Sequence, residues 1–275
     1  MTDILSHLRK TLLRKSARIR ADEFVIRGVW NFTMRSQPNS NERTFTESGC
    51  LVATSGLGAS FRAGSQSVPI PDSLTGQDGC QVVADDRALQ VAILDACYAV
   101  LPQSPTEDHV LNGDTVSKSI KRARIVRNEV ELIADHLAIS KSSVLMIGVV
   151  HTIAEQLCDA GMKTVLSDLD PRIVGSMVAG AKVYHGSMNV HLIRECDIVL
   201  ATGMIITTET FDEILAVARQ YAKPLVMFAQ TGSNFAEEYL ALGIDSVVAE
   251  RYPWYCLPGQ SVIRVFRRKC GGHEE

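Results

Sequence analysis

The chain has 275 residues, a net charge of −3, 46% hydrophobic residues and 21% charged residues. This composition is typical of a globular protein, and the length predicts about two domains. The small net charge gives no electrostatic basis for binding nucleic acid. No apolar run reaches the roughly 18 residues that a membrane span needs. We therefore expect neither nucleic acid nor a membrane among its partners.

The first twenty positions combine leucines with many basic side chains. An Arg-rich segment with few acids is also typical of a transit peptide. We favour an amphipathic helix with a solvated basic face, because Asp3 interrupts the pattern and the segment runs directly into a predicted strand. The seven cysteines are widely spaced and contain no CxxC pair, so a reducing cytoplasm is the expected location.

The first part of the chain predicts a small α+β domain, residues 1–112. Strand-like and glycine-rich segments come first, and two helical patterns flank a polar stretch. The expected elements are a strand over 23–34, a turn over 37–41, a strand over 49–54, a flexible glycine loop over 55–59, a helix over 86–101 and an interdomain linker over 103–113. A further helix, over 117–137, leads from the linker into the second domain. Residues 60–80 show no period and are expected to form a functional loop.

The second domain, residues 113–275, is organised around residues 143–171. An apolar run ends at Gly148, a helical pattern stops at Gly161, and a second apolar run leads to Asp168 and Asp170. This order is that of a Rossmann-type unit, in which the acid after the second strand accepts hydrogen bonds from ribose hydroxyls. Two of the three fingerprint glycines are absent, which argues against a standard NAD site. Two alternatives remain open: a site for a ligand without a pyrophosphate, such as S-adenosylmethionine (SAM) or adenosine, and a scaffold that has lost its nucleotide site.

Alternating strands and helices continue to the end of the chain. Strands are expected near 182–184, 197–200, 225–229, 246–249 and 262–266, and capping boxes at Thr210/Glu213 and Asn234/Glu237 predict two helix starts. The predicted fold is α/β, a Rossmann-like doubly wound, mostly parallel sheet of about five or six strands. Ligands bind at the carboxyl ends of such strands, which predicts as cofactor-binding residues Gly148, Asp168, Asp170, Gly203, Thr208 and Gln230.

Several side chains are candidates for chemistry. His151 is a candidate general base, and the alternative is that it is simply a polar loop residue. Tyr184 is a candidate aromatic face for a sulfonium, and the alternative is that it is a packing tyrosine at a strand end. Cys50 is a weak nucleophile candidate without an identifiable histidine partner. The aromatic pair at 254–255 is expected to cover the pocket or to form a homodimer interface, the second being more ordinary.

Metal binding has little local support. No HxxxH or CxxC pattern is present, and His185 and His191 do not have zinc-ligand spacing. A spatial cluster of His151, Asp168 and Asp170 remains an alternative site for a hard cation.

With these segments placed, the chain resembles the putative heavy-metal chelation domain family. The segments that carry the resemblance are FVIRGVWNFTMRS, GCLVATSGLG, ALQVAILDACYAV, ATGMIITTETFDEIL and MFAQTGSNFAEEYLALGID. The resemblance implies a Rossmann-like C-terminal domain behind an enolase-N-terminal-like domain. The chain departs from the family pattern at Thr208, where Asn is common, and at Gln230-Thr231, where the family has Gly-Pro. Both departures lie at the expected ligand edge.

Three functions are compatible with these features. The first is an enzyme that binds SAM or a related adenosine ligand and catalyses group transfer from SAM, or its cleavage or cyclisation, in making an amino-acid-derived metabolite. Such a metabolite could itself be a metal chelator, which would link this chemistry to the family's description. The second is a non-catalytic protein that binds a metal or metal complex between the domains. The third is an NAD-dependent oxidoreductase, for which Asp168 would favour NAD over its phosphorylated form.

Overall fold

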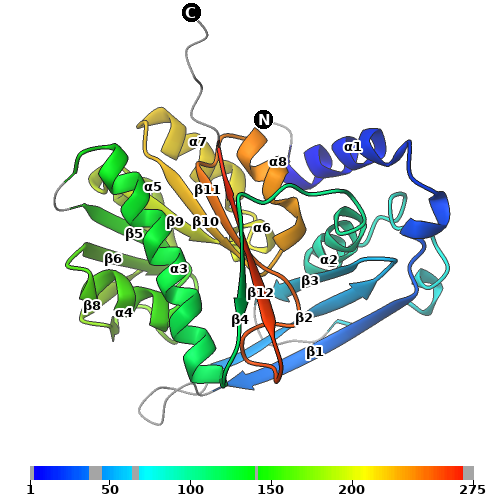
Figure 1. The fold of residues 1–275 in the computed structure, drawn as a ribbon, viewed down its shortest axis with the longest axis horizontal. Helices are drawn as coiled ribbons and strands as arrows, with labels where there is room; N and C mark the ends of the chain where they lie inside the picture. Colours follow the sequence, from blue (N-terminus) through cyan, green and yellow to red (C-terminus); the bar gives the residue numbers. More distant parts are fainter. Residues whose placement is uncertain (1–2, 37–44, 64–67, 140–141, 269–275) are drawn as a thin grey trace, which may run out of the picture.

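The computed structural model describes residues 3–36, 45–63, 68–139 and 142–268. The expected α/β fold class is confirmed, with a large, mostly parallel sheet and a small antiparallel one (Figure 1). The turn expected at 37–41 lies outside the described residues. The large sheet contains the strands β4 Glu107–Leu111, β5 Ser143–Ile147, β6 Lys163–Asp168, β7 Met177–Val178, β8 Ala181–His185, β9 Ile198–Thr202, β10 Leu225–Ala229, β11 Ser246–Glu250 and β12 Ser261–Arg267.

The large sheet has the strand order β4-β12-β11-β10-β9-β5-β6-β8-β7. The strands from β11 to β8 are parallel, whereas β12, β4 and β7 pair antiparallel with their neighbours. From β5 the chain moves outward through β6 to β8, and it then returns to β9 on the other side of β5. The strand order therefore reverses between β5 and β9, where open α/β sheets bind their ligands.

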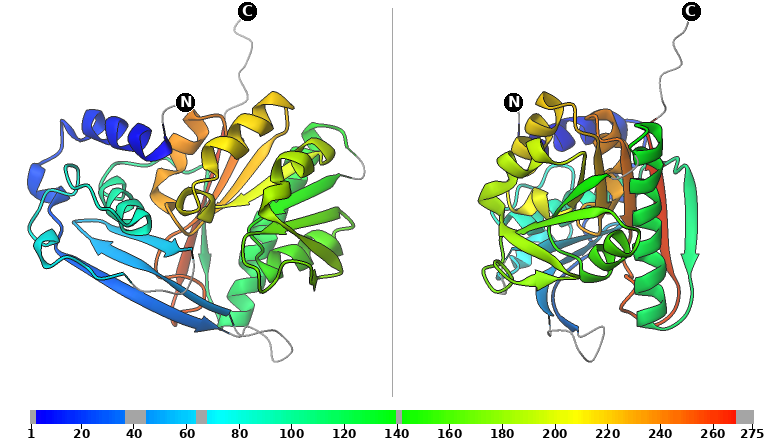
Figure 2. Two further views of the ribbon diagram at one scale, coloured as in Figure 1. Left: turned by 180° about the vertical axis from the view of Figure 1, so that it is seen from behind. Right: turned by 90° about the vertical axis from the view of Figure 1, so that its left-hand side faces the viewer.

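Helices cover both faces of the large sheet (Figure 2). One apolar core lies between the sheet and the helices α3 and α4, and the other lies between the sheet and the helices α5, α7 and α8. Parallel strands covered on both faces read as continuous apolar runs, which is why they were evident in the sequence. The helices are α3 Thr115–His136, α4 His151–Asp159, α5 Asn189–Glu195, α6 Met204–Thr207, α7 Phe211–Gln220 and α8 Ala236–Ala241.

The first part of the chain forms an antiparallel meander packed on a helix. Its elements are α1 Ile4–Ser16, β1 Gly28–Ser36, β2 Phe45–Ala53, β3 Leu57–Arg62 and α2 Arg87–Tyr98. The loop expected at 55–59 is wrong in part, because most of it belongs to β3. A Cβ on Gly58 would lie 2.1 Å from the amide nitrogen of Ala96 in α2. The glycine thus permits close strand–helix packing and does not make the segment flexible.

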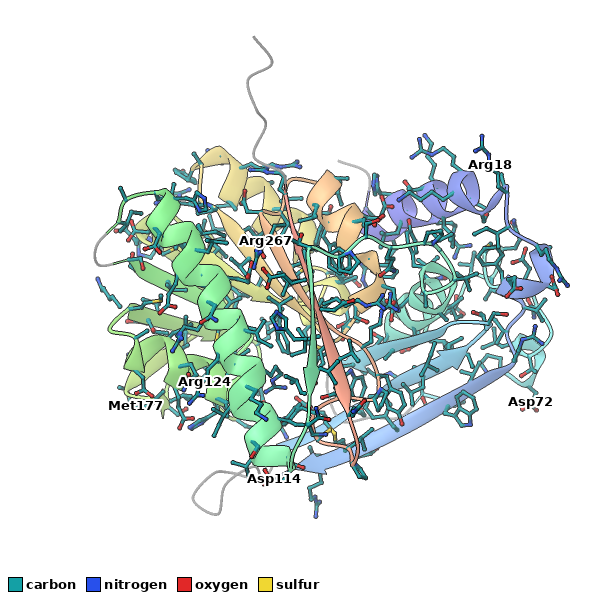
Figure 3. The ribbon with its side chains drawn as sticks, viewed as in Figure 1. Arg18, Asp72, Asp114, Arg124, Met177 and Arg267 are labelled. Atoms are coloured by element: carbon teal, nitrogen blue, oxygen red, sulfur yellow. The ribbon has the colours of Figure 1, made fainter. Side chains whose placement is uncertain are left out.

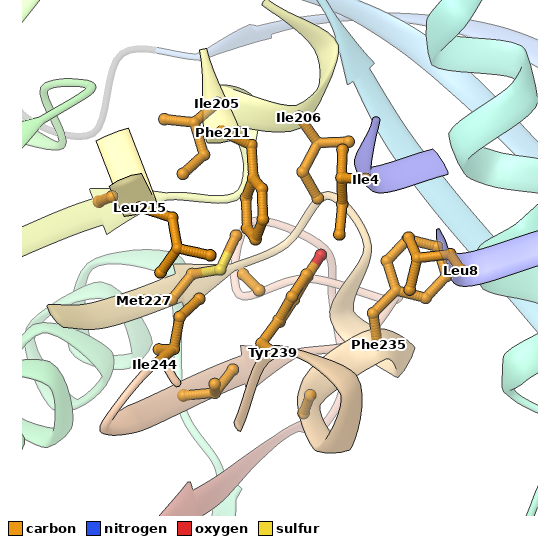
Figure 4. Close-up of a cluster of buried hydrophobic side chains, with 14 of the residues drawn as sticks. Ile4, Leu8, Ile205, Ile206, Phe211, Leu215, Met227, Phe235, Tyr239 and Ile244 are labelled. Carbon is orange, nitrogen blue, oxygen red and sulfur yellow. The ribbon is translucent and has the colours of Figure 1, made fainter. Parts of the chain in front are cut away.

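The helix α2 joins the two parts of the molecule. Every residue from Ala88 to Tyr98 is buried, because one face packs on the small sheet and the other faces α1 and the core of the large sheet. Figure 4 shows Ile4 and Leu8 of α1 beside Phe235 and Tyr239 of the second part. Lys10, Arg14 and Lys15 of α1 are exposed, as expected for the basic face of an amphipathic helix, whereas Arg9 donates to the carbonyl oxygens of Gln81 and Val82.

Three local expectations are wrong. The segment expected as a linker contains β4, an edge strand of the large sheet whose side chains are mostly exposed. Neither capping box forms, because Thr210 makes no capping bond to α7 and Asn234 donates to the carbonyl oxygens of Leu57 and Asp95. Those two carbonyls lie in the first part of the chain, so a long-range contact takes the place of the local cap.

Candidate functional site

A cavity of about 530 Å3 lies at the carboxyl ends of the parallel strands, where the strand order reverses. Its volume falls in the range of pockets for small organic ligands. Both parts of the chain line it. The lining includes all six residues expected to bind a cofactor: Gly148, Asp168, Asp170, Gly203, Thr208 and Gln230. The structure thus brings these residues together, and their role in binding stays a prediction.

The turn after β5 is held by Asp168, the last residue of β6. The carboxylate of Asp168 accepts hydrogen bonds from the amide nitrogens of Val149 and Asp170, each at 2.8 Å, one on each oxygen. Gly148 has φ of +82° in this turn, a conformation that other residues rarely adopt. Each carboxylate oxygen keeps capacity for a further hydrogen bond. Asp168 therefore fixes the turn and still offers acceptors to the cavity that it lines.

Glycine is also required at position 148 by close packing against β9. A Cβ there would lie 2.2 Å from the hydroxyl oxygen of Thr202. This hydroxyl is buried and has no hydrogen-bond partner among the described residues. The first turn of the site and the strand on the other side of the reversal point are thus in direct contact.

The small sheet contributes the opposite wall of the cavity. Phe61 and Arg62 of β3 and Glu47 of β2 all line it. Sequence reasoning missed Glu47, because nothing in the local pattern tells which end of a hairpin faces a distant domain. Glu47 is exposed at the cavity wall. Loss of hydration is nevertheless the largest cause that raises its pKa; Arg122 and Arg172 oppose this shift, and Asp168 raises the pKa further.

A polar network of Gln230, Glu250, Arg122 and Tyr255 lies behind the cavity wall. Gln230 donates to the carboxylate of Glu250 at 2.7 Å, and the Arg122 guanidinium lies 3.6 Å from that carboxylate. The guanidinium also stacks 3.8 Å from the ring centre of Tyr255. Burial raises the pKa of Glu250, and Arg122 opposes that shift. The network holds the carboxamide of Gln230 at the cavity wall.

The two residues expected to be catalytic are not among those that line the cavity. His151 begins α4, and its ring nitrogen lies 3.1 Å from the carboxylate of Glu155 one turn later. The side chain of Tyr184 on β8 is partly exposed, with the ammonium of Lys182 5.4 Å from its ring centre. Each therefore has a partner on its own element.

Two other expectations are corrected by burial. Cys50 is fully buried beside the guanidinium of Arg62, at 3.1 Å, and desolvation raises the pKa of its thiol to about 11. It therefore lacks the reactive thiolate that a nucleophile needs. Trp254 and Tyr255 do not form an exposed lid or a dimer surface, because both are buried and Trp254 stacks on Phe61 with ring centres 4.6 Å apart.

The described residues contain no group of three or more His, Cys, Asp and Glu side chains that could hold a metal ion. The cluster suggested for a hard cation does not form. Asp170 is instead paired with the guanidinium of Arg172, at 2.7 Å, and His151 is paired with Glu155. Among the described helices, none has the length and apolar character required to cross a membrane.

The comparisons with known proteins agree with the family resemblance seen in the sequence. A family profile described as putative heavy-metal chelation matches residues 133–249. A protein of unknown function from that family, from Desulfitobacterium hafniense, is 12% identical with a TM-score of 0.55, and the match covers 94% of this chain and 99% of that chain. Another, from Pyrococcus horikoshii, is 16% identical with a TM-score of 0.50, and the match covers 90% of this chain and 86% of that one. No curated protein sequence matches. At these sequence identities the structural similarity supports a shared fold and nothing further.

Proposed function

We propose, from the premise that this chain belongs through its residues 133–249 to the putative heavy-metal chelation family, that the cavity binds SAM or a related adenosine compound. The reaction would be group transfer from this ligand, or its cleavage or cyclisation, in making an amino-acid-derived metabolite. The observation that carries the proposal is the position of Asp168. It lies at the end of β6, anchored to the glycine turn, in a cavity at the point of strand-order reversal.

Asp168 suits a ribose because of its remaining acceptor capacity. A ribose supplies two adjacent hydroxyl donors, and each oxygen of this carboxylate has accepted one backbone amide only. Hydrogen bonds to a charged acceptor are worth about 1.5–3 kcal/mol each. Asp168 would therefore hold the adenosine part of the ligand.

The turn after β5 favours a ligand without a pyrophosphate. The amide of Val149, which could otherwise face a phosphate, already donates to Asp168. The side chains at 149 and 150 are valines that line the cavity, and only one fingerprint glycine is present. A pyrophosphate needs free amides and close backbone approach. These features support SAM over the alternative of an NAD-dependent oxidoreductase.

SAM, when bound, supplies carbons activated by the adjoining sulfonium. The chain's own part is to hold and enclose the ligand. Two residues that line the cavity, Thr208 after α6 and Gln230 after β10, differ from those common in the family, so we expect the second substrate to differ from that of close relatives. Gln230 is fixed by Glu250 and presents a polar group of defined position.

The family's description makes metal binding the second candidate. A metal held directly by protein side chains does not fit the described residues, which lack a cluster of ligands. A metal complex, or a protein that makes a chelator, remains compatible with the cavity. Elemental analysis of the purified protein tests this candidate, and a stoichiometric metal that survives Asp168→Asn would favour it over ours.

Titration calorimetry and thermal shift with SAM and adenosine test the proposal. Loss of a hydrogen bond to a charged group predicts at least roughly tenfold weaker binding for Asp168→Asn. Asp197→Asn is the matched control, because Asp197 also accepts from a backbone amide, that of Ser143 at 2.8 Å, but at the opposite end of β5. It should lower stability and leave binding unchanged. No heat and no thermal shift with the native chain would contradict the proposal.

A further inference from the structure

The charges that line the cavity are unevenly compensated. Arg62 is bound by both oxygens of Asp86, at 2.8 and 3.2 Å, and Arg172 is paired with Asp170 at 2.7 Å. These two guanidinium groups are therefore largely neutralised by partners of their own. The remaining charged side chains of the lining are the carboxylates of Glu47 and Asp168.

These two carboxylates face the cavity from opposite parts of the chain. Glu47 comes from β2 of the small sheet and Asp168 from the end of β6. Among the described residues the carboxylate of Glu47 makes no hydrogen bond or ion pair. Two cations act on this carboxylate, and each has a carboxylate partner of its own: Arg122 is paired with Glu250 and Arg172 with Asp170. Two carboxylates that repel each other across a partly desolvated cavity create a negative potential there.

The remaining wall suits an organic cation better than a hydrated metal ion. Phe61 and Phe228 line the same cavity. The guanidinium of Arg122 lies 5.3 Å from the ring centre of Phe228, so Phe61 is the ring that can serve a cationic ligand. Aromatic rings interact favourably with sulfonium and ammonium groups. A metal ion would require further ligands in a set geometry, and the described residues do not provide them.

We infer that the cavity selects a ligand with a cationic centre, seated between Glu47 and Asp168, so that the small sheet supplies the charge recognition and the large sheet the ribose recognition. This inference rests on the proposed function and refines it. The preferred ligand is the positively charged sulfonium compound, and its neutral thioether product is bound less tightly. A product that loses its charge on reaction would thus leave the site more readily than the substrate.

Two stable adenosine compounds test the inference. Sinefungin carries an ammonium where SAM carries its sulfonium, and S-adenosylhomocysteine carries a neutral thioether at that position. Calorimetry should show that the native chain binds sinefungin roughly tenfold more tightly than the thioether, as expected for one charge-assisted contact. Glu47→Gln keeps the shape of the side chain and should bring the two affinities within about twofold, mainly by weakening the binding of sinefungin.

The control is Glu195→Gln, which removes the same charge from an exposed position at the end of α5, outside the cavity lining. It should leave the ratio of affinities at its native value. Equal affinities in the native chain, or a ratio that persists in Glu47→Gln, would overturn this inference and leave the adenosine site standing. Failure of both compounds to bind would overturn the proposed function and this inference together.

Discussion

Replacing Gly148 by alanine tests the packing of the first turn of the site. At φ of +82° an L-residue pays about 1–2 kcal/mol in backbone strain. The new Cβ would also lie 2.2 Å from the Thr202 hydroxyl oxygen and 3.2 Å from its Cβ, and such overpacking costs about 1–3 kcal/mol. Together these give a loss of about 2–5 kcal/mol in the free energy of unfolding.

Urea denaturation of single and double variants separates the two contributions. Thr202→Ala removes the side chain against which the new Cβ would pack, so the double variant should recover the packing part and keep the strain. Gly161→Ala is the matched control for strain alone, because Gly161 has φ of +77° and nothing lies within 4 Å of its Cβ position. It should lose about 1–2 kcal/mol.

If Gly148→Ala lowers the free energy of unfolding no more than Gly161→Ala does, the Cβ at position 148 is not overpacked against Thr202. The reasoning is likewise refuted if the cost of Gly148→Ala is the same with threonine and with alanine at position 202. Either result would mean that the turn after β5 can shift away from β9.

The remaining predictions concern two buried ionisable side chains: Asp95, which joins the parts of the molecule, and Arg122, which is paired within the second part. Asp95→Ala leaves the buried amides of Ala59 and Asn234 without acceptors, so calorimetric unfolding should show a loss of about 2–6 kcal/mol at about 1–3 kcal/mol per group. Burial raises the pKa of Asp95 to about 7, against about 3.9 in the unfolded chain. Its contribution to stability is therefore greatest below about pH 4 and is lost as the pH rises to about 7. Urea denaturation at several pH values should show this dependence in the native chain and not in Asp95→Asn. Arg122→Met leaves Glu250 buried without its cation and should cost about 3–5 kcal/mol in the same measurement.

Each of these predictions has a control on the same or a neighbouring element. Asp85 lies exposed just before α2, and Arg124 lies on the exposed side of α3 (Figure 3). Changing either to alanine should alter stability by less than about 0.5 kcal/mol. Equal losses in Arg122→Met and Arg124→Ala would show that the buried pair is not a special contributor. A pH profile of Asp95→Asn parallel to that of the native chain would assign the titration to another group.

The part of the fold that follows from local pattern could be predicted from the sequence. A buried parallel strand is visible in the sequence as a continuous apolar run. The helices α2 and α3 show a helical period of apolar residues, and the turn after β5 is marked by Gly148. Because the carboxyl ends of parallel strands meet at one edge, residues as distant as Asp168 and Gln230 were expected on one side of the sheet. The structure places both at one cavity.

The parts that depend on long-range contact could not be predicted. The strand β4 is polar because it is an edge strand with mostly exposed side chains. The side chain of Asn234 spans to the first part of the chain instead of capping its own helix. Glu47 reaches the cavity only because α2 docks the small sheet against the large one, and no local period carries that information.

The central claim is that the cavity binds an adenosine compound through Asp168. A crystal structure of the protein grown with S-adenosylhomocysteine tests it most directly. The account predicts the ligand in the cavity between the two sheets, with both ribose hydroxyls within hydrogen-bond distance of the Asp168 carboxylate. A ligand bound elsewhere, or in the cavity with its ribose away from Asp168, would contradict the account.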